Sequence, residues 1–441
     1  MPTVELSMIV KDGESTLARC LESARSVVDE IVIADTGSTD ATVQIARSYQ
    51  ARVVDVPWED DFSKARNAAL RHGRCDWVLF LDADELLDLA DAKGIAALVA
   101  DPAVLGYDVR IWNYVSTLST RMLNRPAQRN PHRIEASRSF PGYVEHVNVR
   151  LFRRHPEIFF EGRVHEGVAD CMKRKGLKVA PASFVIHHLG IAEDPAEQRN
   201  RKMEYYQELG RKKLEEAPDD ALANYELGLG ELEHFHNPGG ALKYFMRAIE
   251  LKRDSDVLFT YAGMCLVRLG EAEKGLEVLQ RAERLGARDA VHLEAMGDAQ
   301  YHMERFGEAR RSYEAALTAG SESIILKGKL GVCEVRLGST EAGLHRIQHA
   351  IEHEPQFGEL YDILMAAALF AGDRPLAAET AERRLRVGTP SADSFLLTAG
   401  IWVQLGEWQK AAGVAQSGCQ RFPADARLCS ALAEVNQKLG I

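Results

Sequence analysis

The sequence predicts an α/β domain followed by an all-α repeat array, because its apolar pattern changes type along the chain. From residue 6 to about residue 190, short apolar runs alternate with amphipathic helical segments. Beyond about residue 195 these β-type runs disappear, and a pattern with a fixed period replaces them. A chain of 441 residues is also too long for one ordinary core, so two structural units are expected.

The first half alternates strands and helices in the order that builds a parallel sheet. Strands are predicted at 6–10, 31–35, 52–56 and 77–82, with helices over about 17–28, from near 38–42, and over 63–72. The strands are continuously apolar, which is typical of strands covered by helices on both faces. Ligands of such sheets bind outside the carboxyl ends of the strands.

The second half repeats every 34 residues. Blocks begin at Asp256, Ala290, Ile324, Gly358, Ala392 and Ala426, and one more begins at Ala221 with a single extra residue near 236–240. Small residues recur at the eighth position and glycines at the fifteenth, which predicts close helix packing and a turn with positive φ. The pattern resembles the tetratricopeptide repeat. We therefore expect domains over 1–195 and 221–441, joined by a helical linker over 196–220.

Stacked repeats of this kind curve and expose a concave groove, in which extended peptides or partner proteins bind. Binding of a peptide or protein is one interpretation of this array. The other is that the array joins two copies into a homodimer or acts as a scaffold.

Composition excludes several other classes of protein. A net charge of −11 argues against a nucleic-acid binder. The N-terminal segment reads as a strand rather than a signal peptide, and no apolar run has the length of a transmembrane segment, so a cytoplasmic protein is expected. Seven scattered cysteines without CxxC spacing predict neither a disulfide framework nor a zinc site.

Carboxylates gather directly after the predicted strands. Glu14 follows the first strand, Asp35 closes the second, and Asp82 and Asp84 close the strand at 77–82. Neither GxGxxG nor GxxxxGK[ST] is present, so the rim lacks a glycine-rich cradle for phosphates. A carboxylate-lined site holds phosphates through a divalent cation, and Mg²⁺ or Mn²⁺ is expected. If the strand continues through Asp84, the side chains of Asp82 and Asp84 point to the same face of the sheet, because side chains alternate along a strand. Glu85 then lies outside this pair and has no expected catalytic role.

Four segments together resemble a known enzyme family: "LSMIVKDGE", "DEIVIADTGSTDAT", "WEDDFSKARNAAL" and "DWVLFLDADELL". They are similar to the nucleotide-sugar-binding half of inverting family 2 glycosyltransferases of the GT-A fold, particularly the bacterial subgroup with C-terminal tetratricopeptide repeats. The fold class implied is a GT-A α/β domain followed by a tetratricopeptide-repeat solenoid.

The resemblance implies roles for residues of the rim. Asp35 contacts the uracil end of the nucleotide, Val10 and Glu14 flank the base, and Arg66 reaches toward the nucleotide. Asp84 is the more direct metal ligand of the DxD motif and Asp82 lies nearer the ribose or sugar. From the residues alone, the alternative for Asp35 is that it caps the following helix, and capping is the favoured interpretation of Asp40.

Two later segments complete the predicted site. In "FFEGRVHEGV", Glu166 is the candidate base that takes the acceptor proton, and His165 is a candidate substrate contact. In "FVIHHLG", His188 aligns with a family histidine and is a candidate metal ligand. The alternatives are that the His–Glu pair is structural or binds the acceptor, and that His188 is a structural core histidine.

Arginines also recur every four residues in the segment 121–133, at Arg121, Arg125, Arg129 and Arg133. Pro126 and Pro131 exclude one continuous helix, so a mobile loop is predicted. A clamp for the diphosphate and an ordinary solvated loop are both compatible with this pattern.

These features predict a metal-dependent inverting transferase that uses a nucleotide-sugar donor, with UDP-hexose or UDP-N-acetylhexosamine expected. The acceptor is predicted to be a peptide or protein recruited by the repeats. One alternative acceptor is a cell-envelope saccharide or lipid-linked saccharide. The other alternative is a non-catalytic binding protein on a transferase scaffold.

Overall fold

The computed structural model describes residues 2–117, 120–122, 125–193, 195–252 and 255–440. It divides into two compact units, residues 1–253 and 254–441. Among the described residues, the first unit contains the α/β sheet and the second contains helices and the turns that join them. This is the predicted fold class, an α/β domain followed by an all-α repeat array.

The first unit is built on a mixed sheet whose strand order is β3-β2-β1-β4-β10-β6-β11-β5, with β9 paired to β10. The strands are β1 Val4–Val10, β2 Glu30–Asp35, β3 Arg52–Asp55, β4 Trp77–Phe80, β5 Glu85–Leu87, β6 Gly106–Val115, β9 Gln128–Arg129, β10 Gly142–Arg153 and β11 Val179–His188. A separate hairpin pairs β7 Arg121–Met122 with β8 Arg125–Pro126. β1 to β4 pair in parallel, as their continuous apolar pattern predicts, while β10 is antiparallel to both β4 and β6.

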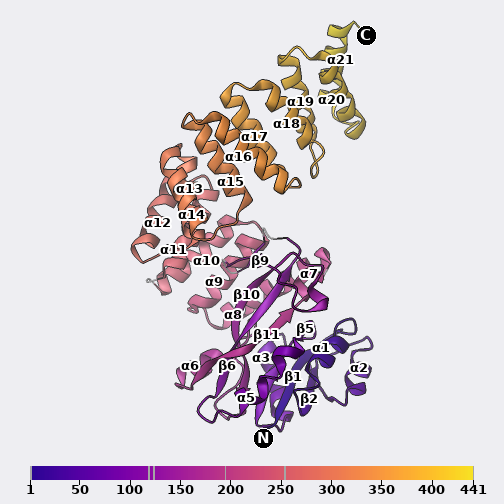
Figure 1. The fold of residues 1–441 in the computed structure, drawn as a ribbon, viewed down its shortest axis with the longest axis vertical. Helices are drawn as coiled ribbons and strands as arrows, with labels where there is room; N and C mark the ends of the chain where they lie inside the picture. The colour runs from indigo at the N-terminus through magenta and orange to yellow at the C-terminus, as the bar shows by residue number, and fades with distance from the viewer. Residues whose placement is uncertain (1, 118–119, 123–124, 194, 253–254, 441) are drawn as a thin grey trace. The chain divides into compact units, whose positions relative to one another are not determined.

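Helices and short helical turns connect these strands (Figure 1). They are α1 Leu17–Ala24, α2 Thr42–Ser48, α3 Phe62–His72, α4 Leu89–Ala92, α5 Ile95–Val99, η1 Glu135–Ser137, α6 Ala169–Arg174 and α7 Gly190–Glu193. The helix predicted over about 17–28 ends at Ala24, and its apolar side chains Leu17, Cys20, Leu21 and Ala24 are all buried. Asp61 caps α3 by accepting a hydrogen bond from the Lys64 N–H.

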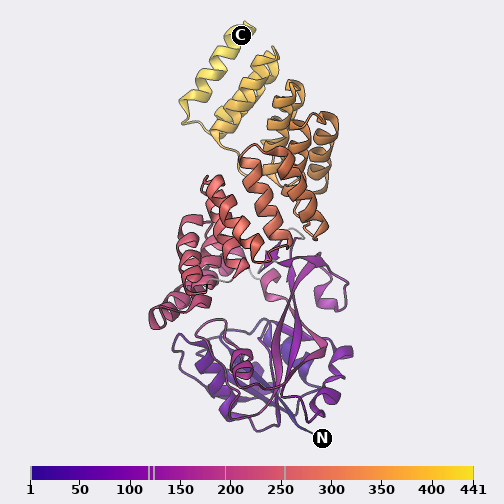
Figure 2. The same cartoon turned by 90° about the vertical axis from the view of Figure 1, so that its left-hand side faces the viewer.

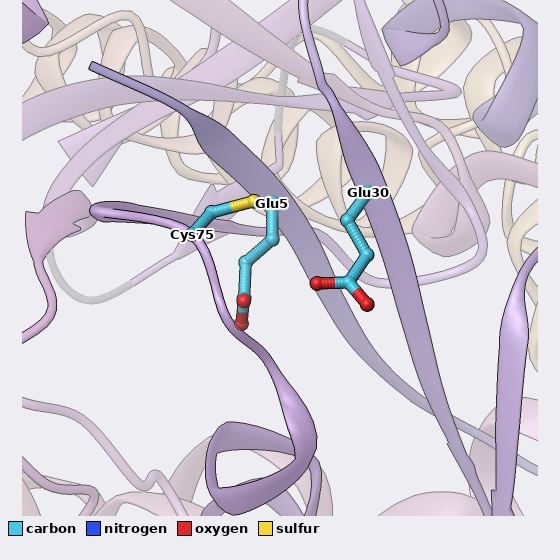
Figure 3. Close-up of side chains that lie close together, drawn as sticks. All are labelled: Glu5, Glu30 and Cys75. Carbon is cyan, nitrogen blue, oxygen red and sulfur yellow. The ribbon is translucent and has the colours of Figure 1, made fainter.

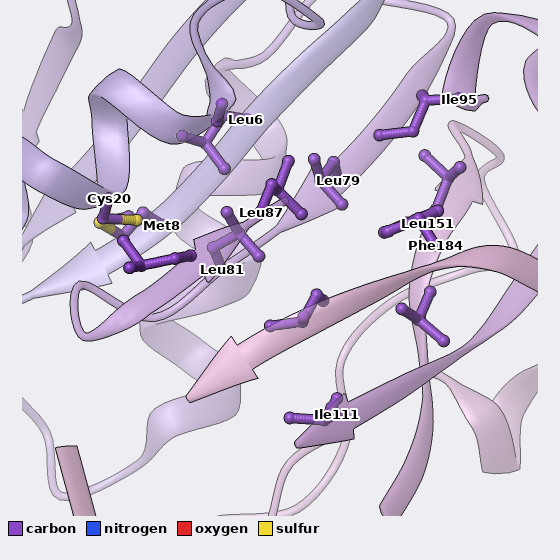
Figure 4. Close-up of a cluster of buried hydrophobic side chains, with 14 of the residues drawn as sticks. Leu6, Met8, Cys20, Leu79, Leu81, Leu87, Ile95, Ile111, Leu151 and Phe184 are labelled. Carbon is purple, nitrogen blue, oxygen red and sulfur yellow. The ribbon is translucent and has the colours of Figure 1, made fainter. Parts of the chain in front are cut away.

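The sheet must curl, because β5 follows β4 after only four residues yet lies at the far edge beside β11. In a flat sheet that edge would be about 19 Å from β4, whereas the link reaches at most about 18 Å. Curling brings apolar side chains of β4 and β5 into one core with those of β1, β10 and β11 (Figure 4). Leu79, Leu87, Leu151 and Phe184 are among its buried members.

Three more helices complete the first unit: α8 Ala196–Glu216, α9 Ala221–Leu229 and α10 Pro238–Leu251. α8 occupies most of the predicted linker, and two of its side chains bind Asp60 in the loop before α3. Its Lys212 binds Asp60 at 2.7 Å, and the Tyr205 hydroxyl donates to the same carboxylate at 2.7 Å. The extra residue of the first repeat, predicted near 236–240, is absorbed just before that segment, in the π-helical turn Gly230–His234.

The second unit consists of helix hairpins at the predicted period (Figures 1 and 2). Its helices are α11 Asp256–Arg268, α12 Ala272–Arg284, α13 Ala290–His302, α14 Phe306–Thr318, α15 Ile324–Arg336, α16 Thr340–His353, α17 Gly358–Ala371, α18 Arg374–Arg384, α19 Ala392–Gln404, α20 Trp408–Arg421 and α21 Ala426–Leu439. The first helices of successive hairpins begin at the block starts read from the sequence.

The small-residue pattern of the repeats has the predicted cause. At the eighth position a Cβ on Gly263, Gly297 or Gly331 would lie 2.5–2.6 Å from a side chain of the following helix. At the fifteenth position, Gly270, Gly338, Gly372 and Gly406 all have φ between 76° and 93°. Each hairpin from α11 to α20 therefore has at least one glycine that close packing or its turn requires.

Candidate active site

The loops after β1 and β2 are joined at the carboxyl rim of the sheet by side-chain to backbone hydrogen bonds. The Glu14 carboxylate accepts from the Ala41 N–H at 3.0 Å, and Asp40 accepts from the Glu14 N–H at 3.1 Å. Thr36 donates its N–H to the carbonyl of Val10 at 3.0 Å. Val10, Glu14 and the loop that follows Asp35 are thereby brought together.

Asp35 is buried at the end of β2 and turns its carboxylate onto its own loop. It accepts from the N–H groups of Gly37 and Ser38 at 3.2–3.3 Å. Asp40 accepts from the Thr42 N–H at 2.9 Å, beside the start of α2. Asp35 therefore forms a local Asx turn and does not cap a helix, and the N-cap of α2 is Ala41, which has no side-chain capping bond.

The segment after β4 leaves strand geometry before it reaches the two aspartates. β4 ends at Phe80, and residues 82–85 form a turn in which Asp82 donates its N–H to Glu85 at 2.8 Å and Glu85 donates its N–H to the Asp82 carbonyl at 3.0 Å. The expected alternation of Asp82 and Asp84 is therefore wrong. The two carboxylates have different partners.

Arg66 of α3 binds Asp82 and Glu166 at the same time. Its guanidinium lies 2.6 Å from Asp82 Oδ1 and 2.5 Å from Glu166 Oε1, and it stacks over the rings of Phe80 and Phe160. Only 6% of the Arg66 side chain is exposed. Although burial opposes the shift, the charges of Arg66 and Arg150 lower the pKa of Asp82 well below its usual value.

Arg150 is a further residue of this site that the sequence reasoning missed. It is buried on β10, donates to both oxygens of Glu85 at 2.9 and 3.0 Å, and lies 3.8 Å from Asp82. The pairing of β10 with β6 shifts register between Val149 and Leu151, so Arg150 sits at a bulge that redirects its side chain. A lone arginine in the apolar run 149–152 was the signal available in the sequence.

Asp84 and His188 meet although they are 104 residues apart in the sequence. Asp84 Oδ2 lies 3.2 Å from His188 Nε2, and His188 Nδ1 lies 2.8 Å from Asn113 Oδ1. The Asn113 amide nitrogen donates to the Val144 carbonyl at 3.1 Å, so its oxygen must accept the proton on His188 Nδ1. The Nε2 lone pair of a neutral His188 therefore faces the carboxylate of Asp84.

Two acceptors so close repel one another unless a proton or a cation lies between them. Burial lowers the pKa of His188, but the Asp84 carboxylate more than offsets this and raises it. Burial conversely raises the pKa of Asp84, and the charge of His188 lowers it. A carboxylate oxygen and an imidazole nitrogen held by a second partner are a donor set that suits Mn²⁺ or Mg²⁺ with further oxygen ligands.

Glu166 and His165 lie on a short loop closed by a bridge between Glu161 and Gly167. His165 is exposed and has φ of 56°, a conformation that few non-glycine residues adopt. The ring of Tyr206 on α8 lies edge-on to His165 at 6.4 Å, and burial raises the Tyr206 pKa to about 12. Tyr206 had no distinguishing signal in the sequence.

The arginine-rich segment 121–133 contains short strands, so the prediction of a loop throughout is wrong. Arg133 binds Asp91 at 2.6 Å and Asp88 at 3.4 Å, while Arg129 is exposed on β9. The side chains of Arg121 and Arg125 lie outside the described part of the chain.

Among described residues, three potential metal-binding atoms lie mutually within 4.8 Å only at Glu5, Glu30 and Cys75 (Figure 3). This cluster is at the opposite, amino-terminal ends of the strands. Arg154 binds Glu5 at 2.5 Å, and Arg52 binds Glu30 at 2.6 Å. Since arginines already neutralise both carboxylates, the cluster is a poor fit for a metal ion.

Known proteins similar to this chain include glycosyltransferases and repeat proteins. Residues 7–157 match the model of the family described as glycosyl transferase family 2. A TPR repeat-containing protein of Synechococcus elongatus is 33% identical over 235 residues, which cover 52% of each chain. The SPbeta prophage-derived glycosyltransferase SunS of Bacillus subtilis is 25% identical over 167 residues, which cover 37% of this chain and 34% of that protein. The chain thus spans about half, or less, of the length of these relatives.

A solved tetratricopeptide repeat protein from Parabacteroides merdae is 14% identical, with a TM-score of 0.40 over 54% of this chain and 96% of that one. No helix in the described ranges combines the length and apolarity that crossing a membrane requires.

Proposed function

Since the chain carries a glycosyl transferase family 2 domain over residues 7–157, we propose that it transfers a sugar from a nucleotide-sugar to a peptide or protein acceptor, with inversion at the anomeric carbon. The donor proposed is UDP-hexose or UDP-N-acetylhexosamine. The observation that carries the proposal is the pairing of Asp84 with His188 at the carboxyl rim, the edge where open α/β sheets bind ligands.

Asp84 and His188, with Asp82 beside them, would hold Mg²⁺ or Mn²⁺. When bound, the ion supplies positive charge that stabilises the departing diphosphate. Asn113 keeps the proton on His188 Nδ1, so Nε2 stays available as a ligand. Arg66 and Arg150 keep Asp82 ionised and restrain it.

The nucleotide is proposed to lie over the loops after β1 and β2. Val10, Glu14 and Asp35 belong to that surface, and the hydrogen bonds between the two loops fix its shape before the donor arrives. Arg66, held between Asp82 and Glu166, is proposed to reach toward the nucleotide. His165, exposed on its strained loop, is proposed to contact substrate.

Glu166 is proposed as the base. Its Oε1 is held by the salt bridge to Arg66, and its other oxygen is proposed to take the acceptor proton. The acceptor O–H or S–H gives its proton to Glu166 as the new bond forms to the anomeric carbon. The bond from that carbon to the diphosphate oxygen breaks, and the nucleoside diphosphate leaves with the electron pair.

The repeats support the choice of acceptor class, because hairpin arrays present successive first helices as a surface for extended chains. A saccharide or lipid-linked saccharide acceptor, homodimerisation through the repeats and a binding protein without catalysis are the rival proposals. Each predicts a different outcome in the experiment that follows.

The test is a donor screen by mass spectrometry, using peptide and glycan acceptors with and without EDTA. We expect metal-dependent transfer to peptide that disappears in Asp84→Ala and His188→Ala. In Glu166→Gln transfer should fall at least about 100-fold while donor binding persists. Lys64→Gln, which removes an exposed ion pair on the same helix as Arg66, is the matched control and should stay active.

Full activity in EDTA would refute the metal. Transfer to glycans alone would favour the saccharide acceptor, and donor binding without turnover on any acceptor would favour the binding protein. Transfer by a dimer that dissociates when the repeats are removed would favour homodimerisation.

A further inference from the structure

Helix α16 carries a row of histidines that the proposed function does not use. His345, His349 and His353 follow one another at four-residue spacing, so they lie on one face of the helix. All three are exposed, whereas the opposite face buries Ile347 and Ala350 in the repeat core. These histidines are therefore not needed for packing.

The rings are already close together. The centroids of His349 and His353 are 4.2 Å apart with an interplanar angle of 41°, and those of His345 and His349 are 6.4 Å apart. Two imidazole nitrogens that bind one ion at about 2.0–2.1 Å in a cis arrangement lie only about 3 Å from each other. The His349–His353 pair needs less movement than the other pair to reach that geometry.

One of these rings also has a fixed tautomer. His353 Nδ1 lies 2.9 Å from the backbone carbonyl of His349. A carbonyl oxygen only accepts, so Nδ1 carries the proton and Nε2 of the neutral ring offers its lone pair. Metal-binding histidines usually have their second nitrogen held in this way.

The local charge does not oppose a cation. Arg346, one turn before His349, donates two hydrogen bonds to Glu334 of α15, at 2.7 and 2.9 Å, and its charge is thereby neutralised. Glu352, three residues after His349, adds an exposed carboxylate to the same helix.

From this arrangement we propose that His349 and His353 form a surface site for a divalent transition-metal ion, held by two imidazole nitrogens one helical turn apart. The order expected for such ligands is Cu²⁺ above Ni²⁺ and Zn²⁺, with no binding of Mg²⁺ or Ca²⁺, which prefer oxygen. His345 and His353 are eight residues apart, about 12 Å along the helix, so one ion cannot take both.

The test is titration of the full chain, without a histidine tag, with Cu²⁺, Ni²⁺ and Zn²⁺ by calorimetry at neutral pH. His349→Ala should weaken this site at least about tenfold, since even the loss of a residue that only supports a ligand costs that much. His353→Ala should do the same, whereas His345→Ala should change the affinity less than about twofold. Alanine favours helix more than histidine does, so α16 should remain folded in all three variants.

A His188→Ala variant separates this site from the carboxyl rim, because in that variant the ion should still bind to His349 and His353. With Cu²⁺, electron paramagnetic resonance should report two nitrogen ligands in the parent and one in His349→Ala. Equal affinity and equal ion number in the parent and His349→Ala would overturn the proposal. A loss in His345→Ala as large as that in His349→Ala would overturn the assignment to this pair.

Discussion

Replacing Glu85 by glutamine tests whether the turn that presents Asp82 depends on a buried ion pair. Glu85 is 1% exposed and accepts three hydrogen bonds, two from Arg150 and one from the Asp82 N–H. The Glu85→Gln side chain keeps nearly the same volume, so packing should be unchanged. What it removes is one acceptor and one negative charge.

The expected cost follows from which oxygen is replaced. Glu85 Oε2 accepts from both Asp82 and Arg150 Nη1, whereas Oε1 accepts from Arg150 Nη2 alone. In Glu85→Gln the amide oxygen should therefore take the place of Oε2 and keep its two hydrogen bonds. The amide nitrogen should take the place of Oε1, so the bond from Arg150 Nη2 is lost. Breaking a buried pair costs about 3–5 kcal/mol, so we expect about 3 kcal/mol here.

Urea unfolding would measure this loss, with the transition of residues 1–253 resolved by hydrogen exchange in β1 and β4. The midpoint should fall by about 1 M. Arg201→Gln is the matched control, since its pair with Glu197 is exposed and should be worth under about 0.5 kcal/mol. Equal stability of the two variants would refute the reasoning, because the buried pair would then contribute no more than an exposed one.

Three other predictions follow from close contacts and burial. Gly190→Ala should abolish transfer with little change in folding, because its Cβ would lie 1.9 Å from Asp84 Oδ2; an active variant would show that Asp84 can move freely. Gly343→Ala should destabilise the repeats by more than about 1 kcal/mol in urea unfolding, since its Cβ would lie 2.4 Å from a backbone oxygen of the facing helix. The control is Gly413→Ala on α20, where a Cβ would meet open space, and it should stabilise the repeats by up to about 1 kcal/mol. Burial lowers the pKa of His292, so its contribution to stability is complete above the unfolded-state value near 6.5 and is lost as pH falls below it. In His292→Asn the unfolding free energy of residues 254–441 should therefore fall less steeply as the pH is lowered. An unchanged slope would contradict this role of His292.

The repeats were the most predictable part of the fold, because their determinants are local. A period of 34 residues set the starts of α11, α13, α15, α17, α19 and α21, and glycines marked close packing and turns. The first strands were predictable for a similar reason, since continuous apolar runs identify buried parallel strands. The position of β5 was not predictable, because its pairing with β11 joins segments about a hundred residues apart.

For the candidate site, the sequence predicted which loops converge but not how their charges pair. Asp35 and Asp84 lie at the expected rim, yet strand alternation failed at Asp82 because the chain turns there to bury Glu85. The contacts of Arg150 and Asn113 could not be predicted from the sequence, since they depend on a bulge and on the order of β10, β6 and β11. Local patterns identify strand ends, whereas long-range pairing decides which side chains meet.

The short connection between β4 and β5 affects how the protein is made. β5 leaves the ribosome directly after β4, but the strand it pairs with ends at His188, about a hundred residues later. At typical synthesis rates, roughly 5–20 s pass during which Leu86 and Leu87 have no partner strand. The nascent chain therefore exposes an apolar, unpaired strand during that interval, a target for chaperones or for aggregation. A fragment that ends before His188 would keep the DxD sequence but would be a misfolding intermediate and not a minimal enzyme.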